Sequence, residues 1–107
     1  MERNKMIYET LGSDVIEWAK ARKIIPNASP EVQMLKVASE VGELADALIK
    51  GRKIEMMLEF GDVLVTLIIL AEMLEISLES CLELAYHKIK NRTGTMMPNG
   101  VFVKDSI

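Results

Sequence analysis

Aromatic residues, proline and cysteine are all scarce in this chain of 107 residues. Aromatics make up 5% of it, there are three prolines, and the single cysteine, Cys81, excludes an internal disulfide. Few segments alternate β-branched residues between turn residues, so an extensive β-sheet is not favoured. The most apolar stretch, Val63–Leu74, includes Thr66 and Glu72. It is shorter than the ~20 residues of a membrane-spanning helix, so we expect it to form a buried helix.

The chain also lacks an excess of basic residues and an apolar N-terminal segment. Its net charge is −3 and its pI is about 5.2. This balance argues against a general nucleic-acid binder, because such proteins usually carry a basic stripe. Residues 1–10 contain no apolar core of the signal-peptide type. We therefore expect a cytoplasmic protein that binds neither nucleic-acid polymers nor membranes.

Helix-forming residues are abundant, and 50% of the chain is hydrophobic. Apolar residues recur mainly at helical spacing, which predicts an all-α protein. The four expected helices are about Asn4–Lys23, about Pro30–Lys50, about Lys53–Glu75, and from just after Ser77 to about Arg92. Short connections between them favour an antiparallel four-helix bundle in one domain spanning residues 1–107.

Local signals place the ends of these helices. Ser29 followed by Pro30 is a typical helix start, and Ser77 is a second N-cap candidate. Gly51 is placed to end the second helix. The C-terminal tail, from about residue 93, has a turn signal at residues 98–100. Residues 101–103 could form a short extended piece, so we expect an irregular or extended tail.

Two pairs of carboxylates lie in the most apolar part of the chain, Glu40-x-x-Glu43 and Glu59-x-x-Asp62. Residues three apart on a helix share nearly the same face. Each pair lies roughly ten residues from the turn near Gly51, so an antiparallel hairpin brings all four acids to a similar height. Converging carboxylates repel one another and resist desolvation unless a cation is present. Oxygen-only ligands favour Mg²⁺, with Mn²⁺ as a substitute, and suit chemistry at phosphate.

The same spacing also has an ordinary explanation. Glu-x-x-Glu pairs are common on the solvated faces of Glu-rich helices, and this chain has further acid pairs of that kind. A di-iron carboxylate bundle would require Glu-x-x-His on two helices, whereas the only histidine, His87, does not follow a glutamate at that spacing. Gly42 and Gly61, one inside each pair, would allow the two helices to approach closely.

Three segments together resemble the all-α nucleoside triphosphate pyrophosphohydrolases, the MazG-like group. They are LKVASEVGELADAL and EFGDVLVTL, which contain the two acid pairs, and the later AYHKIKNRTGTM, which is similar to small stand-alone members of the group, several of them from phages. The resemblance extends from about Trp18 to Lys104. It implies a hydrolase that converts (deoxy)nucleoside triphosphates to the monophosphate and pyrophosphate.

The resemblance also implies roles for individual residues. Glu40, Glu43, Glu59 and Asp62 would be the catalytic metal ligands, and one of them, or a second metal ion, would activate the attacking water. Basic residues on the last helix of the family contact phosphate, which corresponds here to Lys88 and Arg92; Lys36, one turn before Glu40, is a further candidate. The base pocket of relatives corresponds to Trp18, Ile24 and Asn27.

Broad apolar faces on the second and third expected helices, together with eight methionines, suggest association of copies. Relatives in the group form dimers and tetramers, so we expect a homotetramer or homodimer that binds a nucleotide. Two alternatives stay open. The chain could be a non-catalytic helical interaction module that retains the fold, or a related phosphoribosyl-ATP-type pyrophosphohydrolase.

Overall fold

The structure is a computed structural model that describes the backbone of residues 2–105 and the side chains of residues 9–105. Within this range the chain forms helices and one small two-stranded sheet. In chain order they are α1 (Glu2–Ala21), α2 (Ile24–Asn27), α3 (Pro30–Lys50), α4 (Lys53–Met73), α5 (Leu78–Ile89), β1 (Gly94–Met96) and β2 (Phe102–Lys104). The prediction of an all-α protein with a short extended tail is confirmed.

The predicted helix boundaries are confirmed where capping chemistry sets them. The Ser29 hydroxyl accepts a hydrogen bond from the Val32 amide at 3.2 Å, and Pro30 occupies the first turn of α3. Ser77 caps α5 in the same way, accepting from the Ser80 amide at 3.2 Å. Gly51 ends α3 with a φ of 69°, a left-handed conformation that glycine adopts without steric cost.

Two helices end earlier than predicted because a non-glycine residue turns the chain, and α5 ends at Ile89, three residues before the predicted Arg92. Lys23 follows α1 with a φ of 65°, and Glu75 follows α4 with a φ of 57°. Lysine and glutamate rarely adopt this conformation, so neither residue signals a helix end in the sequence. The break expected around Pro26 contains the short α2, whose residue Ile25 has non-helical backbone angles.

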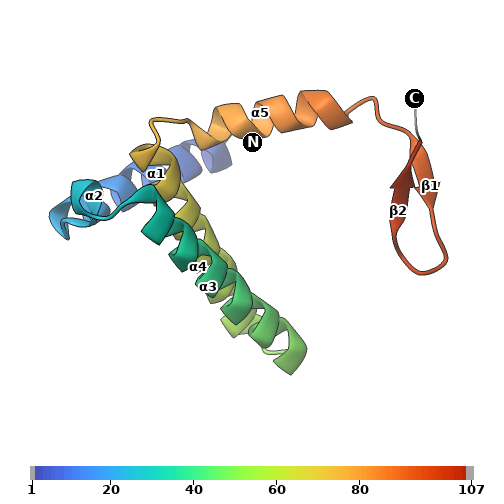
Figure 1. Ribbon diagram of the computed structural model, residues 1–107, viewed down its shortest axis with the longest axis horizontal. Helices are drawn as coiled ribbons and strands as arrows, with labels where there is room; N and C mark the ends of the chain where they lie inside the picture. The colour runs from blue at the N-terminus through green and yellow to red at the C-terminus, as the bar shows by residue number, and fades with distance from the viewer. Residues whose placement is uncertain (1, 106–107) are drawn as a thin grey trace.

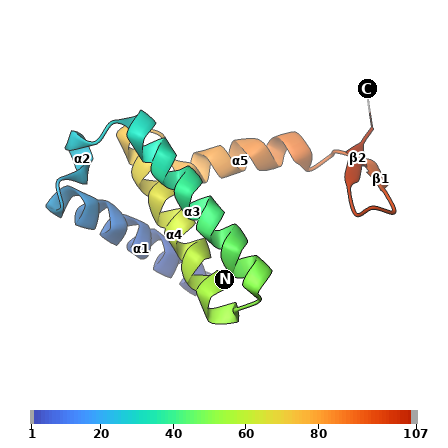
Figure 2. The same cartoon turned by 60° about the horizontal axis from the view of Figure 1, so that its bottom comes forward.

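An antiparallel hairpin of α3 and α4 is the main packed unit of the chain. Figures 1 and 2 show the two helices side by side along their length. The turn that joins them contains Gly51, which ends α3. The buried residues of α3 are Gln33, Val37, Glu40 and Ala47, and those of α4 are Thr66, Ile69 and Ala71. A polar side chain thus occupies about half of these core positions, which is unusual and directs attention to the hairpin.

The other helices pack mainly against α4. Residues of α1 and of the second half of α4 lie together, and Ala19 of α1 is fully buried. The short α2 contacts α1 and α4. In the described residues α5 contacts no helix except α4, and both views show it extending away from the α3–α4 hairpin. Within one chain, α5 therefore does not pack into a four-helix bundle with α1, α3 and α4.

The C-terminal strands form a small hairpin beyond α5. β1 and β2 pair antiparallel, with Thr95 opposite Val103, and the turn between them contains Gly100 at a φ of 86°. The radius of gyration is 16.7 Å, compared with about 13 Å for a compact domain of this size. The difference reflects the projection of α5 and the strands. None of the helices in residues 2–105 combines the length and apolar character needed to cross a membrane.

Candidate metal centre

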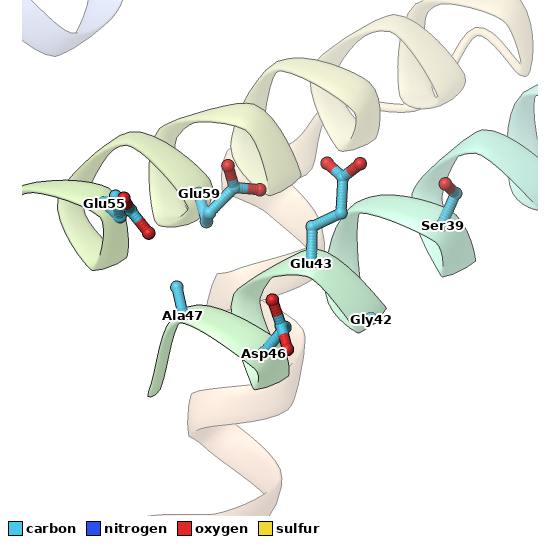
Figure 3. Close-up of a pocket in the computed structure, with 7 residues that line it drawn as sticks. All are labelled: Ser39, Gly42, Glu43, Asp46, Ala47, Glu55 and Glu59. Atoms are coloured by element: carbon cyan, nitrogen blue, oxygen red, sulfur yellow. The ribbon is translucent and has the colours of Figure 1, made fainter. Parts of the chain in front are cut away.

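Three carboxylates converge between α3 and α4. Glu40 and Glu43 come from α3 and Glu59 comes from α4, and one oxygen of each lies within 4.8 Å of the corresponding oxygens of the other two. Figure 3 shows Glu43 and Glu59 extending into the space between the two helices, one from each helix. The antiparallel hairpin therefore brings together acids that lie at the same height on its two helices.

Two of these carboxylates each have one oxygen that is withdrawn from water without a hydrogen-bonding partner. Glu40 is only 7% exposed, and Glu59 is half-buried. Oε2 of each residue is buried and accepts no hydrogen bond from any part of the chain that the structure describes. An ionised oxygen in this position bears an uncompensated desolvation cost. A hard divalent cation would remove that cost, so the all-oxygen donor set fits Mg²⁺ or Mn²⁺.

Lys36 is the cation that the chain itself places beside the cluster. Its Nζ lies 3.1 Å from Oε1 of Glu40, one helical turn away. This contact with the Lys36 ammonium holds the pKa of Glu40 below its usual value. Glu40 in turn raises the pKa of Lys36, and Glu43 and Asp62 add to that effect more weakly. Lys36 therefore lies within the field of several acids, at the edge of the predicted phosphate site.

Glu43 has the opposite electrostatic environment. The neighbouring Glu40 carboxylate, followed by Glu59, raises the pKa of Glu43 above its ordinary value. Repulsion between like charges disfavours the ionised form of the exposed member of the cluster. The two acids of one pair thus differ: Glu40 is held ionised by Lys36, and Glu43 takes up a proton more readily.

Asp62, the fourth predicted ligand, lies outside the three-acid group. It is exposed on α4, and its carboxylate does not belong to the set of converging oxygens found among the described residues. Its charge still reaches the site, because it contributes to the raised pKa of Lys36. Direct ligation by Asp62 stays a prediction.

A cavity of about 480 Å³ opens beside the cluster. Glu43 and Glu59 line it together with two acids that the sequence argument did not assign to the site, Asp46 and Glu55 (Figure 3). Glu55 is paired with Arg52 at 3.1 Å. The signal for both acids was present in the spacing, since Asp46 follows Glu43 by three residues and Glu55 precedes Glu59 by four.

The two basic residues predicted on the last helix do not meet the acids within one chain. Lys88 lies in the last turn of α5, and Arg92 follows that helix. In the described residues α5 has no contact with α3 and extends away from the hairpin (Figure 1). A contact of Lys88 or Arg92 with phosphate at this cluster stays a prediction.

The three predicted base contacts lie around the end of α1 and α2. Trp18 is 47% exposed, carries the Arg22 guanidinium 5.7 Å from its ring centre, and lines a small apolar hollow that shares no residue with the acidic cavity. The Asn27 side-chain amide donates to the Lys23 carbonyl at 2.8 Å and so supports the turn. Ile24 is half-buried. Their role toward a base stays a prediction.

The expected role of the two glycines inside the acid pairs is wrong within one chain. A Cβ atom added at Gly42 or Gly61 would meet no atom within 4 Å. These glycines therefore do not mark a close approach of α3 to α4. Gly42 instead lines the acidic cavity.

Comparison with known proteins gives two positive findings. Residues 28–97 match the family of the MazG nucleotide pyrophosphohydrolase domain. The structure is similar to that of the cyanophage S-2L MazG-like pyrophosphohydrolase bound to dGDP and three catalytic Mn²⁺ ions per active site, with a TM-score of 0.68 and 21% sequence identity over 92% of this chain and 96% of that one. No curated protein matches the sequence.

Proposed function

The chain belongs to the MazG nucleotide pyrophosphohydrolase family, and on that basis we propose that it hydrolyses nucleoside or deoxynucleoside triphosphates to the monophosphate and pyrophosphate with Mg²⁺ or Mn²⁺ as cofactor. The family makes the chain a hydrolase. The matched region contains all the acids of the cluster, and the fold match covers nearly the whole chain.

The observation that carries the proposal is the pair of buried, unpartnered oxygens of Glu40 and Glu59 next to Glu43. Three ionised acids this close would repel one another in a purely structural role, and a chain with no use for them would gain by replacing them with apolar side chains. We assign Glu40, Glu43 and Glu59 as ligands, with Asp62 as a fourth ligand from the next turn of α4. When bound, the cation would supply charge neutralisation at the phosphate oxygens and lower the pKa of a coordinated water.

The residues of the chain then have distinct tasks. With a divalent cation bound, the carboxylates would hold the substrate's phosphates at the hairpin, and one of them, or a second metal ion, would activate the attacking water. Attack breaks the bond between the α-phosphate and the bridging oxygen, and pyrophosphate leaves with that oxygen. Lys36, 3.1 Å from Glu40, is placed to donate to a phosphate oxygen at the edge of the site. Trp18, Ile24 and Asn27 are the proposed contacts to the base.

A homo-oligomer, either a dimer or a tetramer, completes the proposal. The chain leaves large apolar side chains exposed on every long helix with described side chains, and within the described residues α4 is the one helix with which α5 packs. A second copy that covers these faces would bring its Lys88 and Arg92 to the phosphates. Light scattering at micromolar concentration tests this, and a monomeric mass would contradict it.

The activity is tested by incubating the protein with a panel of ribo- and deoxynucleoside triphosphates and Mg²⁺ and identifying the products by ³¹P NMR. We expect pyrophosphate and a monophosphate from at least one substrate, and no reaction in EDTA. Phosphoribosyl-ATP belongs in the panel, because turnover of that compound alone would identify the related pyrophosphohydrolase. Release of orthophosphate and a diphosphate would contradict the proposed bond cleavage, and binding without turnover would favour an interaction module.

A further inference from the structure

A buried hydrogen bond joins α3 to α4 at the end of the hairpin away from its turn. The Gln33 side-chain amide donates to the backbone carbonyl of Thr66 at 3.1 Å, and the two residues are only 6% and 5% exposed. The Thr66 hydroxyl makes a separate hydrogen bond, donating to the Val63 carbonyl at 2.8 Å. A carbonyl has two lone pairs, so Thr66 can accept Gln33 in addition to its own helix bond.

This bond and the acid cluster lie in the same register of the hairpin. Gln33 precedes Glu40 by seven residues on α3, and Thr66 follows Glu59 by seven residues on α4. Seven residues make about two turns, or ~10.5 Å, so the same step along both antiparallel helices leads from the hydrogen bond to the acids. The hydrogen bond and the acids therefore lie at matching levels of the two helices, two turns apart.

The other end of the hairpin is held by the turn. The Gly51 amide donates to the Ala47 carbonyl at 3.1 Å, and Ala47 lies a further seven residues beyond Glu40. Gln33, Glu40 and Ala47 are all buried, so they form one line along α3. The acids thus lie midway between the turn and the Gln33–Thr66 bond. Apolar side chains such as Val37 and Ile69 also pack in this hairpin, but their contacts have no hydrogen-bond direction, and the Gln33–Thr66 bond adds a directional link at the free end.

We propose that Gln33 is a positioning residue: its hydrogen bond to Thr66 fixes the height and rotation of α3 against α4 and so holds Glu40 opposite Glu59. This proposal rests on the proposed function in one respect: it assumes that the acid cluster binds a divalent cation. A polar side chain in a helix–helix seam costs stability compared with an apolar one, and its best-attested use is to specify register. An apolar residue at position 33 would also be buried favourably, but it would not favour one alignment of α3 against α4 over others.

The test compares Gln33→Met, which keeps the length of the side chain and removes the donor, with the unaltered protein. We expect unchanged or higher thermal stability, faster amide hydrogen exchange in residues 33–40 without metal, and about tenfold weaker Mn²⁺ binding by calorimetry, comparable to the loss of an outer-shell partner. In turnover, the metal concentration required for half-maximal rate should rise, while KM for the nucleotide at saturating metal stays the same.

Ile69→Val is the matched control, because Ile69 is buried on α4 close to Thr66 and has no polar group. It should lower thermal stability and leave Mn²⁺ affinity unchanged. Wild-type Mn²⁺ affinity in Gln33→Met, or an equal loss in both variants, would overturn the positioning role. If the unaltered protein binds no Mn²⁺, the proposed function fails, and the exchange comparison alone decides whether Gln33 holds α3 in place.

Discussion

Glu40 and Glu43 lie one turn apart on α3, yet their neighbours shift their pKa values in opposite directions. Glu40 has the Lys36 ammonium at 3.1 Å, which favours its ionised form. Glu43 has the carboxylates of Glu40 and Glu59 instead, which disfavour ionisation. A cation at the cluster would favour the ionised form of all three acids. Proton and metal therefore compete at Glu43 first.

This competition predicts the pH dependence of metal binding. The pKa of Glu43 is raised, so as the pH falls Glu43 is protonated before an ordinary glutamate would be, and Mn²⁺ affinity decreases. Lys36→Gln removes the group that lowers the pKa of Glu40 most, ahead of the hydrogen bond with Glu43. In that variant the loss of affinity should begin at a higher pH than in the unaltered protein. Calorimetry over a pH series measures both, and identical pH profiles would contradict the role of Lys36.

Replacing a single ligand should abolish most of the activity. Glu59→Gln keeps the shape of the side chain and removes its charge, and we expect kcat/KM to fall by roughly 100-fold or more, equivalent to about 3 kcal/mol of transition-state stabilisation. Glu31→Gln is the control, because Glu31 is an exposed acid in the first turn of α3 and lies outside the cluster. Steady-state assays on both variants measure the difference. Comparable activity in the two would remove Glu59 from the site.

At the scale of elements, Gly51 connects the two helices that carry the acids. Its φ of 69° is strained for any residue with a Cβ, so Gly51→Ala should destabilise the fold by about 1–2 kcal/mol. Gly12→Ala is the opposite case. Gly12 lies inside α1 with open space where a Cβ would be, and alanine there should stabilise by about 0.5–1 kcal/mol. Thermal denaturation should show these two shifts in opposite directions; shifts of the same sign would contradict the argument.

The helices could be predicted from sequence because their signals are local. Ser29, Ser77 and Gly51 act on their own helix ends, and apolar spacing marks the rest. The left-handed residues Lys23 and Glu75 carry no such signal, so two helix ends were displaced. The convergence of the acids followed from equal spacing around one turn. Asp46 and Glu55 line the cavity because they lie on the faces of α3 and α4 that border it. The spacing of residues in the sequence does not determine which helix face borders a cavity.

At the scale of the whole molecule, the most conspicuous feature is the exposed apolar surface of its C-terminal part. No local sequence signal sets the direction in which α5 extends from α4, so this part of the architecture could not be predicted. On α5 and the strands, the exposed side chains include Leu82, Leu84, Ile89, Met96, Phe102 and Val103. A twelve-residue helix and an isolated two-stranded hairpin are each marginal in water. A second copy of the chain would stabilise both.

The proposed sharing of residues between copies can be tested by mixing variants. Glu43→Ala lacks a proposed metal ligand and Arg92→Ala lacks the proposed phosphate contact, so we expect each variant to be inactive alone. If Arg92 contacts the substrate bound at the cluster of another copy, each mixed dimer contains one intact site. Random exchange of subunits makes about half of the dimers mixed, so about a quarter of all sites become intact. If each site uses its own Arg92, mixing restores nothing. Activity assays before and after subunit exchange distinguish the two arrangements.

The central claim is that Glu40, Glu43 and Glu59 form a divalent-metal centre, and calorimetric titration of Mn²⁺ tests it most directly. We expect saturable binding to the unaltered protein, binding of the same affinity to Glu31→Gln, and loss of that binding in Glu43→Gln. Equal Mn²⁺ affinity in Glu43→Gln and the unaltered protein, or no saturable binding to the unaltered protein, would contradict the account.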